Sequence, residues 1–310
     1  MFRMNIAFTI FCFCLTRFCY GQSIIEVRSS EDQRLLLYAS LVNLTKGQLH
    51  FTDENGIVFA KFEKNDSLLI SYVGFQNLKT RIDSVGNHAY FLKPAIKVLE
   101  PVRIRNCRNW EMHEYSNLDP DSSERKFGGV ILSTQGMRSR IAIMLRPGIQ
   151  NARLHAFSFW FKGKKVKPNS AIASPMIFSF YSIDKSSMLP GELISNQQVI
   201  YHPVNEGRQA IHIDSMFLSI PEDGMYVSIE YVFNEGYEFP MLMIDQQNGK
   251  ESISMWKGVN LDGVYASDFT LAVYDYQAGS WALAGRRDKS TLLDVKGTIK
   301  FSAEITYCKD

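Results

Sequence analysis

The sequence predicts an all-β protein, and three observations lead to this prediction. Apolar and polar residues alternate with a period of two over many short segments, as they do in strands that bury one face. Clusters of Gly, Asn, Asp, Ser and Pro separate these segments, as turns separate strands. No segment of helix length carries a convincing apolar stripe of helical period. We therefore expect antiparallel sheets with one buried and one solvated face.

The first residues have the features of a secretory signal. Arg3 precedes an apolar stretch at residues 6–15, which is too short to span a bilayer but suits the core of a signal peptide. An uncleaved anchor or a buried strand is the alternative, but Arg17 follows the stretch too soon for a long membrane helix. We expect residues 1–21 to be cleaved before Gln22, which leaves an exported protein without a transmembrane segment. Its location would be the periplasm or the cell surface and outer membrane.

Cleavage changes the charge and the cysteine content. Removing Arg3 and Arg17 balances the basic residues against the 32 acidic ones, so the net charge of the mature chain is near zero. Such a chain lacks the excess of positive charge that favours binding to nucleic acid or anionic membranes. Of the five cysteines, only Cys107 and Cys308 remain. Two cysteines exclude a Cys-rich zinc site and a small disulfide-dense fold.

Residues 22–95 are expected to form the first domain, because strand-length apolar runs and turn clusters follow one another closely there. In residues 51–75 (FTDENGIVFAKFEKNDSLLISYVGF), Asn55-Gly56 supplies the positive-φ residues of a hairpin turn. Residues 64–67 form a second turn cluster. The runs at 57–62 and 68–73 therefore read as two strands.

This segment resembles the carboxypeptidase-regulatory-like domain. The family has a Thr-Asp-x-x-Gly turn before one strand and a Ser-Tyr-x-Gly-Tyr/Phe strand afterwards, and the matching residues here are Thr52, Asp53, Gly56, Ser71, Tyr72, Gly74 and Phe75. The resemblance covers about residues 24–93 and departs from the family in the first strand. It implies a small seven-stranded transthyretin-like or immunoglobulin-like β-sandwich at the N-terminus of an exported Gram-negative envelope protein. It implies no particular ligand.

Residues 96–126 are expected to be a linker, because residues 105–126 are polar and lack clean periodicity. Residues 127–310 are expected to form a larger antiparallel β-sandwich, which resembles the jelly-roll domains that some envelope proteins append. Alternation is clearest in four segments of this domain: 138–146, 154–162, 225–233 and 299–307.

The residues that carry enzyme chemistry are sparse. The sequence has no H-E-x-x-H, no G-x-S-x-G and no Gly-rich phosphate loop. Alternation places His155 on the apolar face with Phe157 and Phe159, as a core histidine. His212 and Asp214 share a strand face, either as a catalytic pair or as a polar contact. We therefore expect no enzyme, no metal site and no cofactor.

Two classes of function stay open at this point. A glycan-binding module needs flat aromatic faces beside hydrogen-bonding groups, and Trp160, Trp256 and Trp281 are the candidates. The favoured interpretation of each one, however, is a semi-buried tryptophan of the sandwich. The other class is an adaptor that presents strand edges or loops to an envelope protein.

The two remaining cysteines suggest a disulfide. Cys107 lies where the chain leaves the first domain, and Cys308 lies near the C-terminus on the outward face of the last strand. Accessible thiols of an exported protein tend to oxidise, so a Cys107–Cys308 bond is one hypothesis. Two free thiols or an intermolecular pair are the alternatives.

Overall fold

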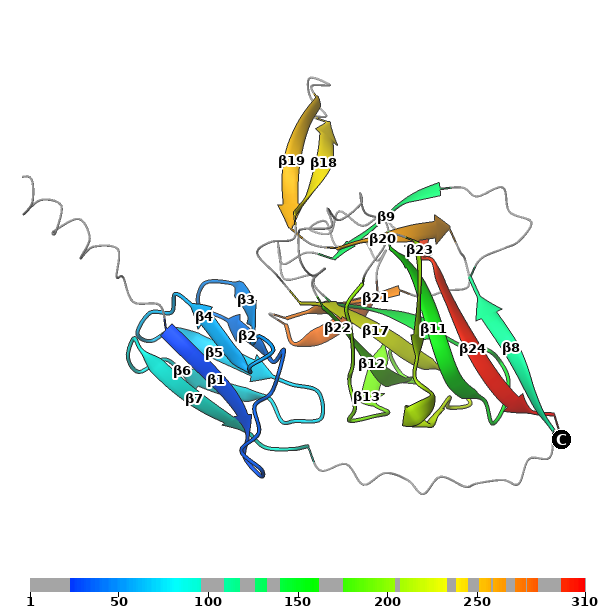
Figure 1. Ribbon diagram of the computed structural model, residues 1–310, viewed down its shortest axis with the longest axis horizontal. Coiled ribbons are helices and arrows are strands. Elements are labelled where there is room, and N and C mark those ends of the chain that lie inside the picture. Colours follow the sequence, from blue (N-terminus) through cyan, green and yellow to red (C-terminus); the bar gives the residue numbers. More distant parts are fainter. Residues whose placement is uncertain are drawn as a thin grey trace, which may run out of the picture. The chain divides into compact units, whose positions relative to one another are not determined.

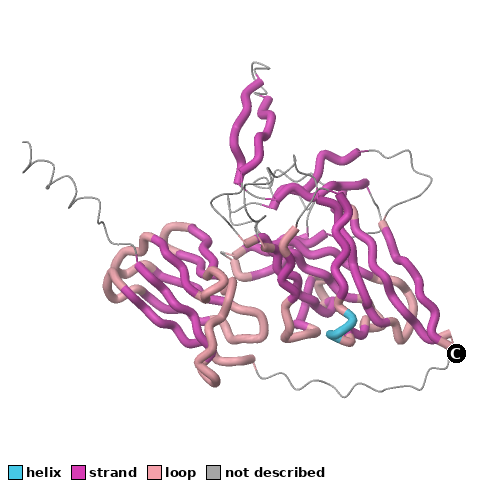
Figure 2. Tube along the Cα trace, viewed as in Figure 1, coloured by secondary structure: helices cyan, strands magenta, loops and turns pink. Residues whose placement is uncertain are grey.

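The computed structural model describes residues 23–95, 109–117, 126–132, 140–161, 175–203, 207–232, 238–244, 251–257, 259–265, 271–276, 278–283 and 297–309. These residues form strands and turns, with one short 3-10 helix, η2 (Asp214–Met216) (Figures 1 and 2). The all-β prediction is confirmed. In this part of the chain, no helix has the length and apolar character needed to cross a membrane. The chain divides into two compact units, residues 1–95 and 96–310.

Unit 1 is a sandwich of two small sheets. One has the order β4-β1-β7 and the other the order β3-β2-β5-β6. Its strands are β1 (Ser23–Ser29), β2 (Ser40–Asn43), β3 (Gln48–Phe51), β4 (Ile57–Ala60), β5 (Ser67–Ser71), β6 (Leu78–Arg81) and β7 (Asn87–Leu92). The β1–β7 pair is parallel and the other pairs are antiparallel. Both sheets contribute to one apolar core, with Ile25 and Val27 on one side and Leu41 and Ile70 on the other.

The turn at residues 53–56 forms, but it does not make a hairpin. Gly56 has φ +68°, and a Cβ there would lie 2.7 Å from the Leu35 Cβ atom, so glycine is required. The Asp53 carboxylate accepts hydrogen bonds from the backbone N–H groups of Asn55 and Ile57. β3 pairs with β2, whereas β4 pairs with β1 in the other sheet. The hairpin prediction is wrong, because this turn carries the chain from one sheet to the other.

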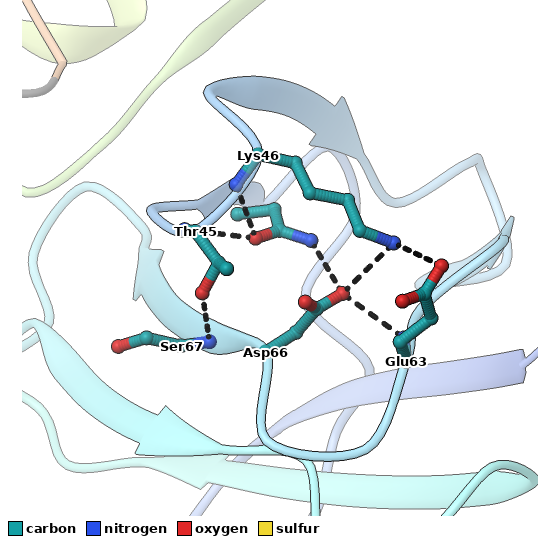
Figure 3. A network of polar contacts seen from close by, with 6 residues as sticks. Thr45, Lys46, Glu63, Asp66 and Ser67 are labelled. Atoms are coloured by element: carbon teal, nitrogen blue, oxygen red, sulfur yellow. Dashed lines mark hydrogen bonds and ion pairs between the residues drawn. The ribbon is translucent and has the colours of Figure 1, made fainter.

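The second turn cluster surrounds a buried carboxylate (Figure 3). The Asp66 side chain accepts hydrogen bonds from Asn43 Nδ2 at 2.8 Å and from the Glu63 backbone N–H at 2.9 Å. Lys46 Nζ lies 3.4 Å from the same oxygen of Asp66. Asn65 takes the left-handed conformation, with φ 73°. Burial works to raise the pKa of the Asp66 carboxyl, but these donors together lower the pKa below its usual value.

Unit 2 contains two larger sheets and a separate hairpin. The first sheet has the order β13-β12-β17-β10-β21-β22, with β14 beside β12. Its strands are β10 (Arg140–Leu145), β12 (Met176–Ile183), β13 (Pro190–Leu193), β14 (Val199–Tyr201), β17 (Met225–Tyr231), β21 (Leu271–Asp275) and β22 (Ser280–Leu283). The hairpin consists of β18 (Glu238–Ile244) and β19 (Glu251–Lys257).

The second sheet has the order β23-β20-β11-β24-β8, with β15 and β16 beside β11 and β9 beside β20. Its strands are β8 (Trp110–Ser116), β9 (Lys126–Leu132), β11 (Arg153–Phe161), β15 (Gly207–His212), β16 (Leu218–Ser219), β20 (Val259–Tyr265), β23 (Gly297–Ile299) and β24 (Phe301–Cys308). Every pairing described in unit 2 is antiparallel.

The main core of unit 2 lies between these two sheets. Phe157 of β11 packs 4.9 Å from Phe178 of β12, measured between ring centroids, and Phe301 of β24 stacks beside Phe157. The alternating residues expected to face inward do so: Ile141, Ile143, Leu145, Met225, Val227, Ile229, Tyr231, Ile299, Phe301, Ala303 and Ile305. Period-two alternation therefore identified these inner faces correctly.

The first sheet lacks the solvated face that we expected. All residues of β17 are buried, and a second cluster that includes Met144, Tyr181 and Tyr226 lies on the side away from the main core. Arg140 and Glu230 form an ion pair on this same side. Successive residues of these strands alternate between two different buried environments. The polar positions of the sequence pattern are therefore not the solvent-exposed positions.

The expected linker is partly a strand. β8 pairs with β24 from Trp110↔Cys308 to Ser116↔Ser302. Asn117 ends the strand, because its side chain donates to the Ile299 carbonyl and accepts from the Phe301 N–H. Residues 126–132 are likewise a strand, β9, which pairs with β20. β8 is the last strand in the order of its sheet, where both faces can be polar, so its sequence lacks the apolar alternation that we used to find strands.

Candidate functional site

The outer face of the second sheet of unit 2 carries a row of polar and aromatic side chains. β8, β24, β11 and β15 lie side by side in register, as Figure 1 shows for the first three. Residues that alternate with the core positions point away from the core. These are Trp110, Met112, Glu114, Arg153, Ser158, Trp160, Arg208, Ser302, Glu304 and Thr306.

His155 belongs to this outer face, and the prediction of a core histidine is wrong. The register of β11 against β24 shifts between Leu154 and Ala156. Such a bulge adds one residue to a strand, so Leu154 and Phe157 both face the core while His155 turns outward. A bulge shifts the alternation of inward and outward side chains by one residue. A strict period of two cannot predict this shift.

The His155 ring joins a carboxylate to a hydroxyl. Its Nδ1 lies 2.5 Å from Asp214 Oδ1, and its Nε2 lies 2.6 Å from Thr306 Oγ1. An ionised carboxylate only accepts, so the neutral ring carries its proton on Nδ1 and accepts from Thr306 at Nε2. Asp214 lies in η2, after the end of β15, so it does not share a strand face with His212 as we expected. Asp214 and Thr306 together hold the imidazole in one orientation.

A pocket of about 350 Å³ opens beside this ring. It is lined by the start of β11 and by η2, with Arg153, Leu154, His155, Asp214, Ser215 and Phe217. Phe217 is 76% exposed and has φ 47°, in the left-handed region that aromatic residues rarely occupy. The volume falls within the range of small-molecule sites.

Arg153 connects the pocket to β8. Its guanidinium lies over the Trp110 ring, 4.9 Å from the centroid, and Trp110 is 43% exposed. The interaction of a cation with an aromatic face orients both groups. Trp110 and Phe217 thus supply exposed aromatic surface, while Arg153, His155 and Asp214 supply hydrogen-bonding groups.

Trp160 lies on the same outer face, as we expected, but away from the pocket. Arg208 lies over its ring at 5.6 Å and donates to Ser158 Oγ and to Glu114 Oε1. Between Arg153 and Trp160, β11 rises by about 23 Å. Trp160 is therefore partly covered by an ion-paired arginine.

The other two candidate tryptophans lie elsewhere. Trp281, on β22, packs edge-on against Tyr181 and Tyr274 beside the second cluster of the first sheet. Trp256 lies on β19 opposite Phe239. Trp160 and Trp281 thus lie in different sheets of unit 2.

Of the five cysteines, Cys308 is the one that lies in the residues described by the structure. Cys308 is disulfide-bonded. Cys107 lies outside the described residues, as do Cys12, Cys14 and Cys19. In the residues that the structure describes, no group of three or more His, Cys, Asp or Glu side chains is placed to hold a metal ion.

Sequence reasoning missed Trp110, Arg153 and Phe217. Trp110 falls in the range expected to be a linker, although Trp110, Met112 and Glu114 alternate with Glu111, His113 and Tyr115 in the sequence. Arg153 is the first residue of the strongly apolar strand β11, which is a usable signal. Nothing in the sequence around Phe217 indicates that its ring is exposed.

Comparisons with known proteins give few relatives. No protein-family profile matches the sequence, and no curated protein matches it. One similar solved structure is a candidate carbohydrate-binding protein from Bacteroides uniformis, with 8% identity, a TM-score of 0.21, and coverage of 78% of this chain and 98% of that one. Another is a DUF3823 family protein from the same species, with 8% identity, a TM-score of 0.18, and coverage of 77% and 98%. A third is the VP2 subviral particle of infectious bursal disease virus, with 10% identity, a TM-score of 0.16, and coverage of 92% and 63%. These scores are too low to support an argument about this chain.

Proposed function

We propose that the protein is an exported, non-enzymatic binding module that takes glycans at the pocket beside η2. The observation that carries this proposal is the meeting of an exposed aromatic ring and fixed polar groups at one pocket. Phe217 offers an apolar face on which a sugar ring can stack, and the half-exposed Trp110 lies against Arg153, which lines the pocket. His155 and Asp214 offer groups that can bind hydroxyls, and their mutual hydrogen bond holds them in place before a ligand arrives.

Four further observations support the proposal. The first residues have the composition of a signal peptide, and the disulfide at Cys308 suits an oxidising compartment. The seven strands of unit 1, in two sheets, agree with a carboxypeptidase-regulatory-like domain of an envelope protein. The hydrogen bonds of His155 lead to Thr306, which lies in β24 between the paired strands β11 and β8. Thr306 is therefore held in place, and it suits the role of fixing the imidazole ring better than that of a mobile nucleophile.

A glycan array, followed by titration of tryptophan fluorescence with the glycans that bind, tests this function. Ligand at the pocket should change the emission of Trp110, and Phe217→Ala should weaken binding about tenfold or more. Phe59→Ala is the matched control, since Phe59 is an exposed phenylalanine of unit 1, with an exposed fraction of 59%. An array without any bound glycan would refute the proposal.

A protein adaptor is the second candidate, favoured by an apolar surface on unit 1. Phe59 of β4 and Phe91 of β7 are exposed on the outer face of the β4-β1-β7 sheet, where Ile24 lies opposite Phe59. Exposed apolar side chains of this size are typical of protein contacts. Cross-linking in the native envelope tests it: a partner captured by the wild type and lost in Phe59→Glu would favour the adaptor.

A further inference from the structure

Among the described residues, Arg153 has no carboxylate partner, and it lines a pocket that a ligand can enter. Arg28, Arg34, Arg140 and Arg208 each form an ion pair. No carboxylate of the described residues lies within 4.0 Å of the Arg153 guanidinium, whose one described side-chain interaction is with Trp110. Arg153 is half-buried and lines the pocket. A partly desolvated guanidinium gains more from an anionic ligand than a fully exposed one does.

The Trp110 ring prepares Arg153 for this role. Stacking at 4.9 Å holds the guanidinium near one plane and leaves its N–H edges available. The planar fork of arginine matches the two oxygens of a carboxylate, and such bidentate bonds are among the stronger ones in proteins. A carboxylate is thus a suitable partner for Arg153.

Asp214 restricts which anion the pocket accepts. Its Oδ1 lies 2.5 Å from His155 Nδ1, and it forms no ion pair with Arg153 among the described residues, but its carboxylate lines the pocket. The Asp214 carboxylate repels a ligand with dense negative charge, and it accepts hydrogen bonds from the hydroxyl groups of a ligand. The pocket therefore favours a ligand with a single carboxylate, several hydroxyls and an apolar ring face for Phe217.

We propose that the glycan bound here contains a uronic acid, with its carboxylate on Arg153, its hydroxyls on Asp214 and its ring against Phe217. This inference rests on the proposed glycan-binding function and names the class of glycan. Neutral glycans lack the group that Arg153 binds, and highly sulfated glycans place additional negative charge near Asp214.

The test compares oligosaccharides of galacturonic, glucuronic, mannuronic and guluronic acid with their carboxyl-reduced counterparts of equal length and linkage. We expect at least one acid form to bind about tenfold or more tightly than its reduced form, because a charged hydrogen-bonded pair is lost. Arg153→Met should remove this preference, and Arg153→Lys, which keeps the charge but not the fork, should retain only part of it. Arg146→Met is the control, since Arg146 is an exposed arginine of the same unit outside the pocket.

The outcomes separate the two proposals. Equal binding of acid and reduced forms, or a preference that survives Arg153→Met, would overturn the uronic acid inference and leave glycan binding intact. Binding of neutral glycans alone would do the same. If no glycan of any class binds, both proposals fail. Thermal unfolding of each variant must match the wild type, so that a loss of binding reports the pocket and not the fold.

Discussion

The guanidinium of Arg140 lies 2.5 Å from the carboxylate of Glu230, on the side of the first sheet that faces away from the main core. The two side chains are 12% and 5% exposed. The rings of Tyr274 and Tyr276 lie beneath the guanidinium at 4.9 and 5.4 Å, and the Tyr276 hydroxyl donates to Glu230. Burial works to lower the pKa of Arg140, but the Glu230 carboxylate outweighs it and raises the pKa. Arg140 is therefore charged at neutral pH.

Removing one partner of this pair should be strongly destabilising. Glu230→Gln keeps the shape but leaves the buried Arg140 charge uncompensated, which typically costs about 3–5 kcal/mol of unfolding free energy. Urea unfolding of the full chain measures the change. Glu111→Gln, which breaks the solvent-exposed pair with Lys309, is the control and should change stability little. A Glu230→Gln variant as stable as the wild type would show that the pair contributes no net stability.

Tyr226 should make unit 2 sensitive to alkaline pH. Its ring is fully buried and its hydroxyl donates to the Met188 carbonyl at 2.7 Å, and burial raises its pKa to about 12. An unfolded tyrosine has a pKa near 10, so the stabilising effect is complete below about pH 10 and is lost as the pH rises through about 12.

Urea midpoints measured between pH 9 and 12 test this effect. The wild type should lose stability over this range more steeply than Tyr226→Phe, which cannot ionise at this position. At neutral pH, Tyr226→Phe should be less stable by about 1 kcal/mol, because the hydrogen bond to Met188 is lost. Parallel pH profiles for the two proteins would contradict the prediction.

The inner faces of both sheets of unit 2 could be predicted from sequence, because alternation follows directly from strand geometry. Ile141, Ile143 and Leu145 illustrate this: their period of two matches a strand that packs against another sheet. The outer face of the first sheet could not be predicted, because Arg140 alternates with these residues and yet is buried by pairing with Glu230. Whether a polar position meets water or a partner depends on tertiary contacts.

Most of the candidate site could not be predicted from the sequence, for a related reason. His155 reaches the outer face only through the bulge before Ala156, and Asp214 meets it only after the chain leaves β15 and enters η2. Trp110 joins the site because an edge strand with two polar faces pairs with β24. Bulges, edge strands and short turns are set by pairing between distant segments, which local sequence does not report.

Asp66 should make unit 1 sensitive to acid. Its folded pKa is lowered, so its contribution to stability is present above the unfolded pKa of about 4 and is lost as the pH falls through the folded value. All four tryptophans lie in unit 2, so hydrogen-exchange mass spectrometry is the suitable measurement for unit 1. Peptides covering residues 40–71 should lose protection between pH 4 and 2.5 after correction for intrinsic exchange.

Asp66→Asn supplies the comparison for this titration. The variant should have less protection at pH 7, because the amide is a weaker acceptor for Asn43 and Lys46, and it should vary less with pH. Glu31→Gln, at an exposed position of the same unit, is the control. A wild type and an Asp66→Asn variant with the same acid profile would show that another group controls the acid response.

The disulfide of Cys308 should be formed with Cys107. β8 and β24 place Trp110 opposite Cys308, and the Lys309 N–H donates to the Asn109 carbonyl at 3.2 Å. Cys107 is three residues before Trp110 in the sequence. Cleavage of the signal would remove the other cysteines. In the chain-entropy account, closing a loop of this length stabilises the folded state by about 5 kcal/mol.

Thiol titration under denaturing, non-reducing conditions decides the pairing in the mature protein. The wild type should have no titratable thiol, and Cys107→Ser should expose one, on Cys308. The variant should also unfold at a lower urea concentration, because the cross-link between residue 107 and the end of β24 is lost and the unfolded chain gains freedom. Two thiols in the wild type, or none in Cys107→Ser, would each rule out the bond, the second because Cys308 would then have a different partner.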